Sequence, residues 1–144
     1  MSITVRPARA REATALAAVA AATFPLACPP SADAADIEAA IAATLSPQRF
    51  AAYLADPDRV ILVATDDGRI VGYTMLVRGI GDDPDIAAAV AHRPAVEVSK
   101  MYVVATHHGT GVSARLMGSG IEWATDGGAA AMWLGVNRNN ERAQ

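Results

Sequence analysis

The sequence predicts one α/β domain of the α+β kind, in which helices flank a central sheet that is mixed and mostly antiparallel. Three observations predict this class: a helical N-terminal third, a β-hairpin in the middle, and a strand, helix and strand toward the C-terminus. The 144 residues, 52% hydrophobic and 19% charged, suffice for one buried core but are few for two. We therefore expect a single domain over residues 1–144.

The N-terminal third has the pattern of a short strand followed by three helices. Ile3–Arg6 alternates like a strand, and Arg9–Thr23 has a helical periodicity that we expect the three prolines of Phe24–Ala32 to end. Asp33 is placed to cap a second helix. The dipeptide Ser46-Pro47 begins a third helix, because serine caps well and proline suits the first helical position.

The middle of the chain contains the clearest local signal, a β-hairpin. The apolar runs Val60–Ala64 and Ile70–Val77 flank Asp67-Gly68, which supplies the positive φ angles that a tight turn needs. A polar loop, Gly79–Pro94, follows and has room for one or two helical turns. The remaining expected elements are a strand Val96–Val104, a helix Gly111–Thr125 and a strand Ala130–Val136.

Charge and cysteine content argue against several classes of function. A formal net charge of -3 disfavours general nucleic-acid binding, and no stretch of about 18 strongly apolar residues suggests a membrane span. The one cysteine, Cys28, cannot form an intramolecular disulfide, which favours a reducing, cytoplasmic setting. His107 and His108 are adjacent and point apart on extended backbone, so we expect no metal site.

The segment from Tyr102 to Met117 has the pattern of an anion-binding turn. A strand runs into a turn that contains Gly109 and Gly111, and the turn opens a helix. Backbone N–H groups at a helix start lack intrahelical partners, and the macrodipole adds positive charge, so a diphosphate binds well there. The spacing fits neither the dinucleotide-binding fingerprint nor the P-loop. By this pattern alone, a tight turn without a ligand is equally consistent.

The same segment resembles the cofactor motif of the GNAT superfamily of N-acetyltransferases, which is Gln/Arg-x-x-Gly-x-Gly/Ala after a strand containing Tyr-Val. Here the strand carries Tyr102-Val103, and the motif runs from His108 to Ser113. His108 stands in place of the glutamine or arginine, and Ser113 in place of the last small residue. The hairpin and Trp133–Ala143 resemble further parts of the family's fold, and a weaker similarity is to its polyamine-acetylating branch.

The resemblance implies an N-acetyltransferase that uses acetyl-CoA as co-substrate and whose fourth and fifth strands splay around the cofactor. It implies that Glu97 relays the proton of the attacking amine; a solvated strand residue is the alternative. Asn140 matches a family asparagine near the pantetheine, and Asn137 is grouped with it, although either would equally serve as a helix cap. The cofactor-binding residues implied are Met101, Tyr102, Val103, His108, Gly109, Thr110, Gly111, Val112, Ser113, Asn137 and Asn140.

Family members usually continue past the position of Ala143, so we expect the family's final helix and last two strands to be missing here. The tyrosine that usually protonates the departing thiolate would lie beyond Gln144. The implied partner is an amine acceptor, either a small molecule or a protein, with no nucleic acid and no membrane. A homodimer stays open. The alternative function is a GNAT-like module that binds acyl-CoA without turnover.

Overall fold

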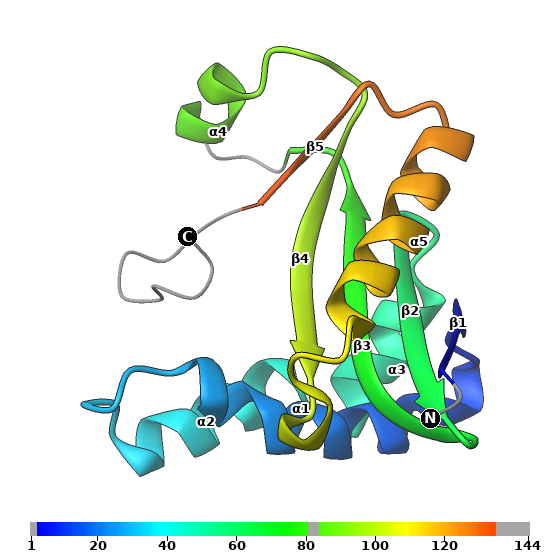
Figure 1. The fold of residues 1–144 in the computed structure, drawn as a ribbon. Coiled ribbons are helices and arrows are strands. Elements are labelled where there is room, and N and C mark those ends of the chain that lie inside the picture. The colour runs from blue at the N-terminus through cyan, green and yellow to red at the C-terminus, as the bar shows by residue number, and fades with distance from the viewer. Residues whose placement is uncertain (1–2, 81–83, 135–144) are drawn as a thin grey trace.

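The chain folds around one five-stranded sheet in the order β1-β2-β3-β4-β5 (Figure 1). The computed structural model describes residues 3–80 and 84–134. Neighbouring strands pair antiparallel except β4 and β5, which are parallel, so the predicted mixed and mostly antiparallel sheet is confirmed. The strands are β1 (Ile3–Pro7), β2 (Arg59–Asp66), β3 (Arg69–Arg78), β4 (Ala95–Val103) and β5 (Ala131–Trp133). The helices are α1 (Ala13–Ala27), α2 (Ala34–Thr44), α3 (Pro47–Ala55), α4 (Pro84–Ala89) and α5 (Val112–Asp126), with 3-10 turns η1 (Ala10–Glu12) and η2 (Ala105–His107).

Helices cover both faces of the sheet (Figure 1). α5 packs on one face, and α1 and α3 pack on the other. The core on the α5 face includes Leu76, Val96, Val98, Val103, Val112 and Leu116. The core on the opposite face includes Leu16, Ala20, Phe50, Val63, Tyr73 and Met75.

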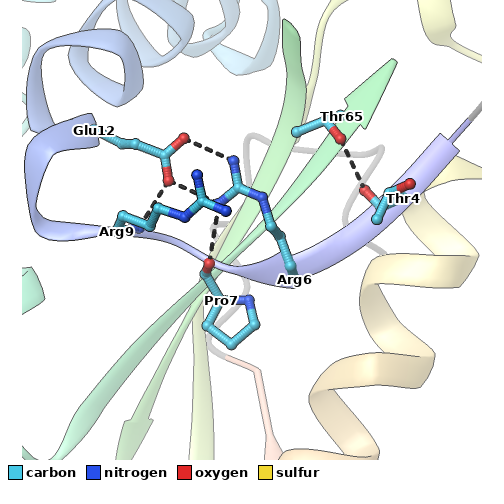
Figure 2. Close-up of polar contacts among 6 residues, drawn as sticks. All are labelled: Thr4, Arg6, Pro7, Arg9, Glu12 and Thr65. Atoms are coloured by element: carbon cyan, nitrogen blue, oxygen red, sulfur yellow. Dashed lines mark hydrogen bonds and ion pairs between the residues drawn. The ribbon is translucent and has the colours of Figure 1, made fainter. Parts of the chain in front are cut away.

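An ion pair fastens the first strand to the first helical turn (Figure 2). The Arg6 guanidinium donates to both carboxylate oxygens of Glu12, at 2.8 and 2.9 Å, and the Arg9 amide donates to the same carboxylate at 2.7 Å. The hydrogen bond from Arg6 lowers the pKa of Glu12 to about 2. The contact therefore holds β1 and η1 in one arrangement at neutral pH.

The expected end of the first long helix is wrong. The prolines were expected to end it at Thr23, but α1 continues through Pro25 to Ala27. Pro25 lies two residues before the helix end, so it removes one hydrogen bond while its fixed φ still suits a helix. Prolines Pro29 and Pro30 lie beyond the end of α1, where the chain does turn.

Caps and the hairpin turn form as predicted. The Asp33 side chain accepts a hydrogen bond from the Ala35 amide at 2.8 Å, and the Ser46 hydroxyl accepts one from the Arg49 amide at 3.2 Å. Asp67 and Gly68 have φ values of 51° and 84° at the tip of the β2–β3 hairpin. These signals depend on a few neighbouring residues, which is why the sequence alone locates them.

Gly72 on β3 allows β3 and β4 to approach closely. A Cβ at this position would lie 3.0 Å from the Tyr102 carbonyl oxygen, 3.2 Å from a methyl group of Val103 and 3.4 Å from a methyl group of Leu116. The two contacts with β4 are tighter than ordinary packing, so a larger residue would push β4 away. Gly72 thereby allows the close approach of β3 and β4 beneath α5.

Candidate functional site

β4 and β5 share only a short parallel pairing. The pairing joins residues 95–97 of β4 to residues 131–133 of β5. β4 then continues to Val103, whereas β5 ends at Trp133, and the two strands lie at an angle to each other (Figure 1). Within the described part of the chain, the edge of β4 from Val98 to Val103 therefore has no strand partner on that side.

The backbone groups of Met101 and Val103 point toward this open edge. The Val104 amide donates to the Val71 carbonyl at 2.9 Å, so Val104 belongs to the ladder with β3. Hydrogen-bonding direction alternates along an antiparallel ladder, which turns the groups of Val103 and Met101 away from β3. The open edge thus carries backbone donors and acceptors that an extended ligand can bind.

The turn before α5 leaves consecutive backbone amides without partners. Gly109 and Gly111 have φ values of +77° and +86°, a conformation that side chains rarely adopt, and Gly111 is the N-cap of α5. The amides of Gly111, Val112, Ser113 and Ala114 donate no hydrogen bond to any residue that the structure describes. With the helix macrodipole, these amides have the arrangement that binds anions.

Space beside these amides is open. A Cβ on Gly109 or Gly111 would meet no other atom within 4 Å. The Thr110 hydroxyl turns back and donates to the His107 carbonyl oxygen, which closes the turn without blocking the amides. The residues present therefore fit a bound diphosphate.

His107 and His108 have different hydrogen-bond partners, and His107 ends the 3-10 turn η2 and does not lie on the extended backbone that was expected. The His108 ring donates through Nε2 to the carbonyl oxygen of Val103 at 2.8 Å, so it binds the end of β4. The His107 ring donates through Nε2 to the Asp66 carboxylate at 2.8 Å. The sequence did not reveal the contact between His107 and Asp66, because the two residues are 41 positions apart.

Among the other sequence-predicted positions, the side chains of Val103 and Val112 are buried, those of Met101 and Tyr102 are partly buried, and that of Ser113 is exposed. Val112 is 1% exposed, and Met101 packs against the α5-side core, so the parts of these two residues left for a ligand are their backbone groups. Tyr102 packs against Tyr73 with ring centres 5.8 Å apart, and burial raises the pKa of Tyr102. Asn137 and Asn140 lie outside the described residues.

Glu97 is partly buried and faces the side of the sheet that α1 and α3 cover. It lies opposite Val77, while Lys100 lies opposite Met75 of the core on that side. The register shifts at Ser99, a β-bulge that puts Glu97 and Lys100 on one face. The sequence analysis did not include Lys100 among the candidate site residues. The signal that could have drawn attention to it is that Lys100 is the one lysine of the chain.

Within residues 3–80 and 84–134, no group of three or more His, Cys, Asp or Glu side chains is placed to hold a metal ion. No helix in the same ranges is long and apolar enough to cross a membrane.

The fold and the site define a mixed α/β domain in which a strand with a free edge runs into a glycine-containing turn at the N-terminus of a helix. The model of the Acetyltransferase (GNAT) family matches residues 27–144, and the chain belongs to this family. An uncharacterized N-acetyltransferase of Mycobacterium tuberculosis is 52% identical over 133 residues, which are 92% of this chain and 78% of the relative. The chain is accordingly an acetyltransferase of this family, whose co-substrate is acetyl-CoA.

Solved structures share the fold at low sequence identity. PaiA N-acetyltransferase from Thermoplasma acidophilum, in complex with coenzyme A, superposes with a TM-score of 0.82 at 18% identity, covering 99% of this chain and 84% of that one. A ribosomal-protein-alanine N-acetyltransferase from Brucella melitensis biovar Abortus gives a TM-score of 0.67 at 19% identity, covering 96% and 82%. At these identities the similarity shows the fold.

Proposed function

We propose that this chain transfers the acetyl group of acetyl-CoA directly to a primary amine of a small molecule or a protein. The observation that carries the proposal is the row of unbonded amides from Gly111 to Ala114, directly after the open edge of β4. With the diphosphate of the cofactor bound at these amides, its extended pantetheine arm can lie along the free edge of β4. The arm would then reach toward Glu97, where β5 closes the gap.

The cofactor-binding residues divide by what each contributes. Within Gly109–Ser113, the partner-free amides of Gly111, Val112 and Ser113 bind the diphosphate, and the backbone of Met101 and Val103 binds the pantetheine arm. His108 holds the end of β4 through the Val103 carbonyl, so it acts on the shape of the site. Tyr102 and Thr110 support the strand and the turn, and Asn137 and Asn140 are assigned to the pantetheine by family resemblance.

The chemistry requires a neutral amine and a stabilised oxyanion. The amine nitrogen attacks the thioester carbonyl carbon, a C–N bond forms and the C–S bond breaks, and the thiolate of CoA leaves and takes up a proton. Glu97 accepts the proton that the amine loses, directly or through a water. The Met101 amide, on the open edge, polarises the thioester carbonyl.

Two measurements test the proposal in order. Acetyl-CoA should raise the melting temperature of the chain, since a ligand that binds the folded state stabilises it. A thiol-release screen across amines should then find an acceptor, and Glu97→Gln should lower kcat/KM by about 100-fold, a typical loss for a general base, and remove the acidic limb of the pH-rate profile. An unchanged profile and rate in Glu97→Gln would remove Glu97 from the mechanism.

The same screen separates catalysis from binding alone. A thermal shift with acetyl-CoA but no thiol release from any amine supports the non-catalytic acyl-CoA-binding module. We also propose that residues 1–144 form one domain. The protein is proposed to work in the cytoplasm, because its single cysteine, Cys28, suits a reducing compartment.

A further inference from the structure

Lys100 is a charged side chain without a partner in the described residues. It is partly buried on β4, and no hydrogen bond or ion pair joins its ammonium to any part of the chain that the structure describes. Burying an ammonium without a partner costs free energy. Lys100 is therefore a cation that no described side chain neutralises.

The bulge at Ser99 gives Lys100 its position. Without the extra residue, Glu97 and Lys100 would point to opposite faces of the sheet, because side chains alternate along a strand. The register shift places them opposite Val77 and Met75, which lie two residues apart on one face of β3. Two residues of strand span about 7 Å, so one cation and one anion stand within the length of a small molecule.

The charged groups around Glu97 and Lys100 leave the Lys100 ammonium available to a negatively charged ligand group. Arg59 lies close by, with its guanidinium 4.0 Å from the Met75 sulfur, but Arg59 is paired to Asp56 at 2.9 Å. Burial and repulsion from Arg59 lower the pKa of Lys100, and attraction to Glu97 opposes this change. Glu97 and Lys100 thus attract each other electrostatically, yet they are too far apart to form an ion pair.

We propose that Lys100 binds a carboxylate group of the acceptor, so that the substrate is an amine that also carries a carboxylate, with free amino acids as the simplest case. This inference rests on the proposed acetyl transfer at Glu97. The substrate's amine lies at Glu97 and its carboxylate at Lys100, so the two ends of the substrate match the two charges of the strand. A cationic polyamine meets repulsion from both Lys100 and Arg59.

The test compares each of several amino acids with its own carboxamide, which keeps the amine and side chain but removes the negative charge. In thiol-release assays, the wild-type chain should have a kcat/KM at least 10-fold higher for the acid than for the amide. Spermidine should be a poorer substrate than the acids. The amine of an amino-acid amide is less basic than that of the acid, so a larger fraction of it is neutral and reactive. Without a carboxylate site the amide would therefore be the better substrate, and a preference for the acid points to such a site.

Two variants connect the preference to Lys100. In Lys100→Met the acid-to-amide ratio should fall at least 10-fold, with the loss in KM for the acid, and Lys100→Arg should restore most of it. Glu97→Gln, in contrast, should lower kcat for acid and amide alike. A wild-type chain that acetylates amides or spermidine as well as acids, or a Lys100→Met variant that keeps the ratio, would overturn the proposal.

Failure of acetyl transfer itself gives a different result. If CoA binds but no amine is acetylated, the same acids and amides are tested by calorimetric binding in the presence of CoA. Tighter binding of acids, lost in Lys100→Met, supports the carboxylate site independently of turnover. Equal binding of acids and amides, or no binding of either, overturns it.

Discussion

His107 donates a 2.8 Å hydrogen bond from Nε2 to the carboxylate of Asp66, and this contact ties the turn before α5 to the tip of the β2–β3 hairpin. The Thr106 hydroxyl lies 3.0 Å from the other ring nitrogen of His107. Because both ring nitrogens have a partner, the orientation of the ring is fixed. The backbone carbonyl of His107 also accepts a hydrogen bond from the Thr110 hydroxyl. The shape of the turn with unbonded amides therefore depends on a hairpin that is distant in sequence.

We expect His107→Ala to weaken acetyl-CoA binding. The variant frees the turn from the hairpin, so KM for acetyl-CoA should rise about 3- to 10-fold, equivalent to roughly 1 kcal/mol for a lost charge-assisted hydrogen bond. Steady-state kinetics with varied acetyl-CoA measure it. His107→Gln should recover part of the affinity through its side-chain N–H. His92→Ala, at an exposed histidine in the loop before β4, serves as control and should leave KM unchanged.

We expect Gly111→Ala to reduce acetyl-CoA affinity at least 10-fold. Its φ of +86° makes alanine unfavourable by about 1–2 kcal/mol, and the methyl group would enter the space beside the unbonded amides. Gly128→Ala provides a matched control, since Gly128 has a φ of +87° and open space around it after the far end of α5. Both variants should melt at lower temperature, and Gly111→Ala alone should lose the thermal shift with acetyl-CoA. Equal shifts in the two would contradict a diphosphate site here.

Local signals explain which parts of the fold the sequence could predict. Asp33, Ser46 and Asp67-Gly68 act within a few residues, so their caps and turn form as expected. The predicted helix end at Thr23 was wrong because the sequence cannot show that the hydrogen bond missing at Pro25, near the end of a helix, is tolerated.

The candidate site divides in the same way. The glycine turn before α5 is visible as a motif, since a strand, two glycines and a helix follow one another along the chain. The shared face of Glu97 and Lys100 is not, because it results from a bulge that only the register with β3 reveals. His108 looked like a substituted cation, and its contact with the Val103 carbonyl became apparent only in three dimensions.

We expect Tyr73→Phe to stabilise the chain. The Tyr73 side chain is fully buried, and its hydroxyl has no hydrogen-bond partner in residues 3–80 and 84–134. Burial raises the pKa of this phenol, so the group stays neutral at all ordinary pH values. Removing an unsatisfied buried hydroxyl should raise the free energy of unfolding by about 1 kcal/mol, measured by urea denaturation. A loss of 1 kcal/mol or more would mean that the hydroxyl is bonded in solution. Tyr53→Phe is the control for loss of a bonded hydroxyl, since Tyr53 donates to the Thr44 carbonyl at 2.8 Å.

We expect the stabilising effect of Glu12 to depend on pH. Its pKa of about 2 in the folded chain lies below the ordinary 4.5, chiefly because of the hydrogen bond from Arg6. A depressed carboxyl pKa stabilises the fold above pH 4.5, and the effect is lost as pH falls from 4.5 to 2. Glu12→Gln should therefore lower the free energy of unfolding by about 1 kcal/mol at pH 7, a modest value because the pair is partly exposed. Urea denaturation at pH 7, 4 and 3 should show wild type and variant converging, whereas Glu38→Gln, at an exposed carboxylate on α2, should differ little from wild type at any of these pH values. A Glu12→Gln deficit that stays constant down to pH 3 would show that the side chain acts through its shape and not through its charge.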